Sequence, residues 1–149
     1  MERLREKLRE RLREKCIRAV VLFGSKARGE DTKHSDLDLL VLHEGCEEKD
    51  PVKLRRKLYA ALKEALNWEV EELTVIDMEL SEFMSPREIT PLLLNIYWDG
   101  IVVYDATGKV QDFLTEVKRR IEASGLRRVK DGRAYYWVLP EPMREVKIL

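Results

Sequence analysis

Two short apolar runs constrain the fold most strongly, because each one adjoins a polar motif. Ile17 to Phe23 reads IRAVVLF, and Leu37 to Leu42 reads LDLLVL. Runs of this length with few polar side chains are typical of strands that are covered on both faces. The sequence therefore predicts a sheet whose central strands are buried, with polar groups only where these strands end.

The remaining patterns place helices and further strands around these two. Helices are expected over residues 2–15, 51–67, 91–98 and 110–121, further strands over 70–76 and 101–104, and a hairpin over 128–139. The hairpin is indicated by Asp131 and Gly132 between two β-prone runs. The order of helices and strands predicts an α+β or α/β fold.

Composition narrows the class of protein. The chain has 149 residues, which fits one domain, and its 28 basic and 28 acidic side chains give a net charge of +0. No global positive field would steer a nucleic acid, so binding to nucleic acid is not expected. The charged N-terminal segment is neither a secretory signal nor a membrane span, and a cytoplasmic protein is expected. Cys16 and Cys46 are too few for a disulfide framework and are interpreted as reduced thiols.

Asp36 and Asp38 are the first candidates for chemistry. They stand two positions apart at the start of the second strand, so their side chains leave the same face of the sheet. Neighbouring carboxylates repel each other unless a cation lies between them. Mg²⁺ is a hard cation that binds carboxylates, waters and substrate phosphates. The spacing therefore favours a metal-nucleotide site over an ordinary charged strand entrance.

Gly24 and Ser25 follow the first strand directly. A glycine at such a turn lets the backbone approach a ligand closely, and the hydroxyl of Ser25 can donate to a phosphate oxygen. The alternative is an ordinary turn with a helix cap. A Walker A motif is excluded because Glu30 stands where lysine is required, and the sequence has no GxGxxG fingerprint.

A third carboxylate on a neighbouring strand would complete a clamp for metal-assisted phosphoryl or nucleotidyl transfer. Glu71 and Glu72 are the candidates. Glu72 shares a strand face with Thr74 and Ile76, and Glu71 shares the other face with Leu73. Alternation alone leaves the choice between them open.

Taken together, Gly24-Ser25-Lys26-Ala27-Arg28-Gly29 and Ser35-Asp36-Leu37-Asp38-Leu39 resemble the GSxARG…SDxDL motif of the minimal nucleotidyltransferases. These enzymes belong to the DNA polymerase β nucleotidyltransferase superfamily. The resemblance implies a mixed sheet flanked by helices, with residues 1–85 as the nucleotidyltransferase core. Residues 86–149 are expected to form a C-terminal extension packed on that core, similar to the one in archaeal members.

The resemblance also implies Mg²⁺-dependent transfer of a nucleoside monophosphate, AMP in our expectation, from an NTP to an acceptor hydroxyl. Asp36 and Asp38 would hold the metal ions, and Gly24 and Ser25 would contact the triphosphate. Glu72 matches the place of the third carboxylate best, although the family usually has aspartate there. It would hold one of the metal ions and help to deprotonate the acceptor hydroxyl. Arg28 is a candidate for phosphate contact, with a structural salt bridge as the alternative.

In many prokaryotic members of this group the domain is the antitoxin partner of a HEPN-domain protein, and some add AMP to a tyrosine of the toxin. The resemblance thus implies a HEPN-domain partner, with an antitoxin-type binding module and a vestigial nucleotide site as the alternative function. Homo-oligomers are a further expectation. The consecutive aromatic residues Tyr135, Tyr136 and Trp137 follow a basic run, but packing of one hairpin face is the preferred interpretation over nucleic-acid binding.

Overall fold

The computed structural model describes residues 1–32, 36–67, 72–140 and 146–149 of the chain. Its helices are α1 (Glu2–Arg11), α2 (Gly24–Arg28), α3 (Pro51–Ala65), α4 (Leu80–Met84), α5 (Pro91–Asp99) and α6 (Val110–Ser124). Its strands are β1 (Ile17–Phe23), β2 (Leu37–His43), β3 (Leu73–Glu79), β4 (Ile101–Asp105), β5 (Arg127–Asp131) and β6 (Ala134–Val138).

Four strands form a mixed sheet in the order β3-β2-β1-β4. β1 is antiparallel to both of its neighbours, β2 and β4, whereas β2 and β3 run parallel. α3 connects β2 to β3, as a parallel pair requires a crossover. The parallel register aligns Leu37 with Leu73 and Asp38 with Thr74, so β2 and β3 start at the same edge of the sheet.

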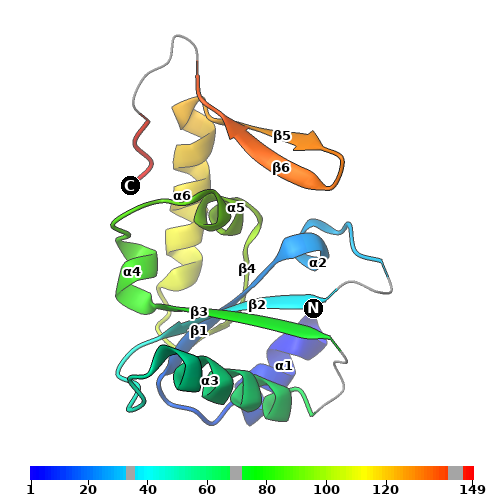
Figure 1. Cartoon of the computed structure of the whole chain (residues 1–149), viewed down its shortest axis with the longest axis vertical. Coiled ribbons are helices and arrows are strands. Elements are labelled where there is room, and N and C mark those ends of the chain that lie inside the picture. The colour runs from blue at the N-terminus through cyan, green and yellow to red at the C-terminus, as the bar shows by residue number, and fades with distance from the viewer. Residues whose placement is uncertain (33–35, 68–71, 141–145) are drawn as a thin grey trace.

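Each face of this sheet is covered by helices, and Figure 1 shows α1 and α3 below it and α5 and α6 above it. Alternate residues of the central strands therefore enter two separate cores. Val20, Leu39 and Val41 pack with α1 and α3, while Val21 and Leu40 pack with α5 and α6. This two-sided burial explains why the two runs read as nearly continuous apolar segments.

Local signals set where the helices begin. The carboxylate of Asp50 accepts from the backbone N–H groups of Val52 and Lys53, and Pro51 occupies the first helical position of α3. Thr90 caps α5 in the same manner. α6 ends at Gly125, which takes a left-handed conformation with φ of 85°.

The C-terminal hairpin of β5 and β6 forms a separate two-stranded sheet. In Figure 1 it lies beyond the end of α6 and reaches back toward α2. After it, Val146 and Ile148 pack on the core that α5 and α6 share with the four-stranded sheet. The expected mixed sheet flanked by helices, with a hairpin in the C-terminal part, is confirmed.

Among the boundaries that differ from expectation, those of α1 and β3 are informative. α1 ends at Arg11 and not at Lys15, because Leu12 already has an extended backbone. β3 runs from Leu73 to Glu79, three residues later than the expected strand, whose first two residues lie outside the described part of the chain. The shift arises because pairing with β2 continues to His43, which brings Asp77 and Glu79 into the strand.

The interpretation of Cys16 and Cys46 as reduced thiols is wrong, since the structure joins them in a disulfide. Both cysteines flank adjacent antiparallel strands, and the Glu44 N–H donates to the Cys16 carbonyl at 2.9 Å. Their Cα atoms are 5.1 Å apart although 30 positions separate them in the sequence. Cysteine spacing along the chain carried no information about this proximity.

Among the helices of the described ranges, none has the length and apolar character needed to cross a membrane.

Candidate active site

The carboxylates of the motif meet where β2 and β3 begin. Asp36 immediately precedes β2, and Thr74 Oγ1 donates a hydrogen bond to Asp36 Oδ2 at 2.8 Å. The Leu37 N–H donates to the Glu72 carbonyl at 3.0 Å, which fixes Glu72 beside Asp36. Asp36, Asp38 and Thr74 hold alternate positions on two aligned strands, so their side chains share one face of the sheet.

Gly24 closes this site from β1. Phe23 pairs with Asp38, so Gly24 follows at the edge where the carboxylates lie. Its φ is +75°, and a Cβ placed there would overlap with Oδ2 of Asp38. Glycine is thus required twice at this position, once for the left-handed backbone and once for the approach of the carboxylate.

The carboxyl groups perturb each other's ionisation. Burial, and then the charge of Asp36, raises the pKa of Asp38. Hydrogen bonds from the Glu72 carboxyl and from Thr74 lower the pKa of Asp36. The raised pKa of Asp38 indicates negative charge held at close range, the situation that a bound cation relieves.

The donor set fits a hard divalent cation, because it consists of carboxylate oxygens on a common face. Within the described ranges, however, no three His, Cys, Asp or Glu side chains are arranged as a ready metal-binding group. Asp36 and Asp38 are the two carboxylates of this face that could hold a metal ion.

α2 begins at Gly24 and contains Ser25, Lys26 and Arg28 of the motif. The Ser25 carbonyl accepts from the Glu30 N–H at 2.9 Å, and this bond closes the helix. Lys26 Nζ lies 3.5 Å from Asp31 Oδ2. The turn between β1 and α2 thus stands beside the carboxylates, as expected for a segment that contacts a triphosphate.

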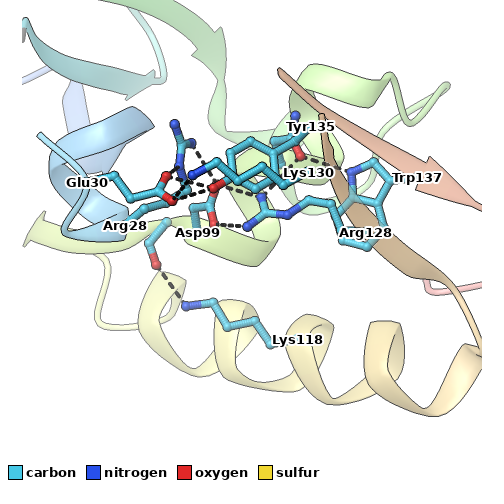
Figure 2. Close-up of polar contacts among 10 residues, drawn as sticks. Arg28, Glu30, Asp99, Lys118, Arg128, Lys130, Tyr135 and Trp137 are labelled. Carbon is cyan, nitrogen blue, oxygen red and sulfur yellow. Dashed lines mark hydrogen bonds and ion pairs between the residues drawn. The ribbon is translucent and has the colours of Figure 1, made fainter. Parts of the chain in front are cut away.

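The side chain of Arg28 extends into a cluster of other charged and aromatic side chains (Figure 2). Its guanidinium donates to Glu30 at 2.7 Å and to Asp99 at 3.2 Å. These two carboxylates outweigh the lowering effect of burial and raise the pKa of Arg28. Both of these hydrogen bonds fit the salt-bridge interpretation of Arg28.

Sequence reasoning missed several residues around the motif. The sequence placed Thr74 only on the same strand face as Glu72, yet its hydroxyl donates a hydrogen bond to Asp36. Asp99 was not among the candidate residues, although its side chain is only 5% exposed and pairs with both Arg28 and Arg128. The signal that the sequence offered for Asp99 was an aspartate at the end of an expected helix. Three residues of interest, His34, Ser35 and Glu71, lie outside the described residues.

The sequence matches the family model of the nucleotidyltransferase domain over residues 1–97. The chain therefore belongs to the nucleotidyltransferase domain family, and the expected enzyme class, a nucleotidyltransferase, is confirmed. A comparison with curated proteins found no match.

Three solved structures resemble the chain at low identity. A toxin-antitoxin with AMP-PNP is 18% identical, with coverage of 82% of this chain and 89% of that chain and a TM-score of 0.43. Two mutants of the toxin-antitoxin MntA-HpeT are 17% and 20% identical, with TM-scores of 0.46 and 0.41. Both alignments cover 82% of this chain, and they cover 89% and 88% of the two solved chains. The family assignment rests on the match over residues 1–97.

Proposed function

We propose that the protein transfers AMP from ATP to a hydroxyl group of an acceptor, with Mg²⁺ as the cofactor. The observation that carries this proposal is the convergence of Asp36, Asp38 and Gly24 at one edge of the sheet. Asp36 and Asp38 would hold the metal ions. Bound Mg²⁺ neutralises charge on the phosphates and stabilises the leaving pyrophosphate.

The chain's own residues have distinct tasks in this reaction. The oxygen of the acceptor hydroxyl forms a bond to the α-phosphorus, and the bond from that phosphorus to pyrophosphate breaks. Glu72 accepts the proton of the acceptor hydroxyl. The hydroxyl of Ser25 donates a hydrogen bond to a triphosphate oxygen, and Gly24 allows the backbone to approach the phosphates.

We propose a tyrosine of a HEPN-domain toxin as the acceptor. The support is the motif resemblance, since some antitoxins of this group modify their toxin in this way. The natural test is the chain with the product of the adjacent gene, incubated with Mg²⁺ and ATP labelled at the α-phosphate. Label is expected on the partner, and replacing the acceptor tyrosine of the partner by phenylalanine should remove it. Label on neither protein would overturn the proposal.

The decisive variant is Asp36→Asn with Asp38→Asn. Transfer should fall by more than roughly a hundredfold, since loss of even an outer-shell partner of a metal ligand costs about that much. Asp112→Asn with Asp131→Asn is the matched control, because it removes the same charge from two exposed positions. Undiminished transfer by the first variant would refute the assignment of Asp36 and Asp38.

Glu72 and Glu71 can be separated by the same assay. Glu72→Gln should lower transfer by about tenfold or more, as loss of a positioned proton acceptor does. Glu72→Asp should keep most of the activity, since it restores the residue usual in the family. Glu71→Gln tests the alternative, and a larger loss with Glu71→Gln than with Glu72→Gln would reverse the assignment.

A second candidate function is an antitoxin that neutralises its partner by binding alone. It is favoured by the contact of Glu72 with Asp36 and by the lack of a ready three-ligand group among the described side chains. The double variant Asp36→Asn with Asp38→Asn separates the two functions. A binding module would neutralise the partner undiminished with this variant, whereas an enzyme would lose neutralisation together with labelling.

A further inference from the structure

The helix α2 depends on contacts from other elements for its stability. It has five residues, and none of them is buried. A helix this short is unstable by itself, because the cost of its first turn is not recovered by further hydrogen bonds. Contacts from outside α2 must therefore set the orientation of the Gly24-Ser25 turn. The contacts of Arg28, the last residue of α2, show where that support comes from.

Asp99 provides the first link. Its carboxylate lies at the end of α5 and is 5% exposed. Arg128 of β5 donates to both of its oxygens, from Nη1 at 2.8 Å and from Nη2 at 2.9 Å. Arg28 donates to Oδ2 of the same carboxylate at 3.2 Å. A bidentate pair is geometrically demanding, so Asp99 fixes Arg28 and Arg128 relative to each other.

Glu30 provides the second link, on the other side of Arg28. It accepts from Arg28 at 2.7 Å, from Lys130 at 3.0 Å, and from the hydroxyl of Tyr135 at 2.6 and 2.7 Å. These three donors lower the pKa of Glu30 to about 2. Lys130 and Tyr135 face each other across the hairpin, so both of its strands reach Glu30.

The ring of Tyr135 joins the two links. The guanidinium carbon of Arg28 lies 4.7 Å from the ring centroid and that of Arg128 lies 4.2 Å from it. Figure 2 shows these side chains gathered between α2, the end of α5 and the hairpin. The hairpin itself is anchored at its base, where Trp137 donates to Asn95 at 2.9 Å and packs against Trp98.

We propose that the β5–β6 hairpin is a clamp that positions α2, and with it the Gly24-Ser25 turn, for the nucleotide. Arg128 and Tyr135 are then positioning residues of the nucleotide site. Arg28 transmits the support through Asp99 and Glu30 and is not itself a phosphate ligand. The inference rests on the proposed function only for its effect on the nucleotide, because the mechanical link is independent of catalysis.

Hydrogen exchange of the full chain tests the mechanical link. Arg128→Ala and Tyr135→Ala should each raise amide exchange in residues 23–31 by about tenfold, the loss expected for a charge-assisted hydrogen bond. Exchange in β2 should stay unchanged. Arg127→Ala and Tyr136→Ala are matched controls, since these neighbours stand on the opposite face of the hairpin and should leave both segments unchanged.

Unchanged exchange in residues 23–31 with both Arg128→Ala and Tyr135→Ala would overturn the clamp, whether or not the chain transfers nucleotides. Should either alanine variant fail to fold, Tyr135→Phe provides the same test. It keeps the ring between the two arginines and removes only the hydroxyl that donates to Glu30. About threefold faster exchange in residues 23–31 is expected, and no increase would refute the inference.

Kinetics then tests the consequence for the nucleotide. Arg128→Ala should raise the KM for ATP about tenfold with little change in kcat, whereas partial unfolding would lower the apparent kcat. Adding Arg28→Lys to Arg128→Ala should cause little further loss, because both act in one linked cluster. If Arg28 bound phosphate directly, the two losses would add, and that result would overturn its assignment. Faster exchange without any transfer by the wild type would refute the proposed function and leave the clamp intact.

Discussion

The two ends of the parallel strands β2 and β3 differ in how their acidic side chains are satisfied. At the end of the strands, Asp77 accepts from Arg55 Nε at 2.7 Å and lies 3.0 Å from Nε2 of His43. At the start, Asp36 has a threonine hydroxyl and another carboxyl group as its hydrogen-bonding neighbours in the described part of the chain. The first arrangement stabilises the fold. At the second, burial and the charge of Asp36 raise the pKa of Asp38, and a bound cation would relieve that repulsion.

Covalent structure follows the same division. The disulfide between Cys16 and Cys46 lies at the end of β2 where His43 pairs with Ile17. The start of β2 has Gly24 in close approach to Asp38. One end is thus cross-linked and charge-balanced, whereas the other brings the carboxylates of the candidate site together. The difference teaches that a carboxylate near protein cations is a poor guide to function here, and a carboxylate beside another is a good one.

The largest effect on stability is expected at the cross-linked end. Cys16→Ser with Cys46→Ser should lower the free energy of unfolding by about 3–4 kcal/mol, as expected for a loop of this length. Denaturant titration measures the change, and reduction of the wild type by a dithiol should reproduce it. A loss under about 1 kcal/mol by both routes would show that the disulfide does not stabilise this end.

Gly24→Ala should follow, with a loss of about 2–3 kcal/mol from backbone strain and from overlap with Asp38. Gly29→Ala is a matched control. Gly29 has a similar φ of +72°, but no atom lies within 4 Å of a Cβ placed there. It should lose only the backbone share, about 1 kcal/mol. Equal losses in thermal unfolding would contradict the close approach of Asp38 to Gly24.

Asp77→Asn and Asp38→Asn should change stability in opposite directions. Asp77→Asn weakens the bonds to Arg55 and His43 and should cost about 1.5–2 kcal/mol, typical of hydrogen bonds to charged groups. Asp38→Asn should cost nothing or stabilise the fold, because burial and the charge of Asp36 raise the pKa of Asp38 and disfavour its ionised form. Equal destabilisation by both variants would contradict the claim that the carboxylate of Asp77 stabilises the fold and that of Asp38 does not.

The smallest effect concerns acid. The pKa of Glu30 is lowered to about 2 from 4.5, so its stabilising contribution is complete above pH 4.5 and is lost as the pH falls toward 2. The protection of residues 23–31 against hydrogen exchange, taken relative to the intrinsic exchange rate at each pH, should decrease over this range in the wild type. Glu30→Gln should flatten that dependence, and an unaltered pH profile would exclude Glu30 as its source.

The sequence was sufficient for the elements and for the position of the motif. Apolar runs located β1 and β2 closely, and Pro51 and Pro91 located the starts of α3 and α5. The face shared by residues 72 and 74 follows from the two-residue period of strands. These features are local, so they can be derived from spacing alone.

Long-range contacts could not be derived in this way. The disulfide depends on which strands become neighbours, and the partners of Arg28 come from Asp99 and from the hairpin, far along the chain. A basic residue within a motif offers no sign that distant carboxylates already bind it. The sequence therefore left Arg28 open between phosphate contact and salt bridge, and its salt bridges are seen only in the tertiary contacts.

The burial of Ile148 has a consequence for how the protein is made. Its side chain is 4% exposed and packs in the same core as Ala19 and Val21 of β1. During synthesis the strand that leads into the motif is therefore complete more than a hundred residues before Ile148 emerges. Until then a nascent chain would expose an apolar face that lacks part of its cover, and chaperones or a partner protein could bind it.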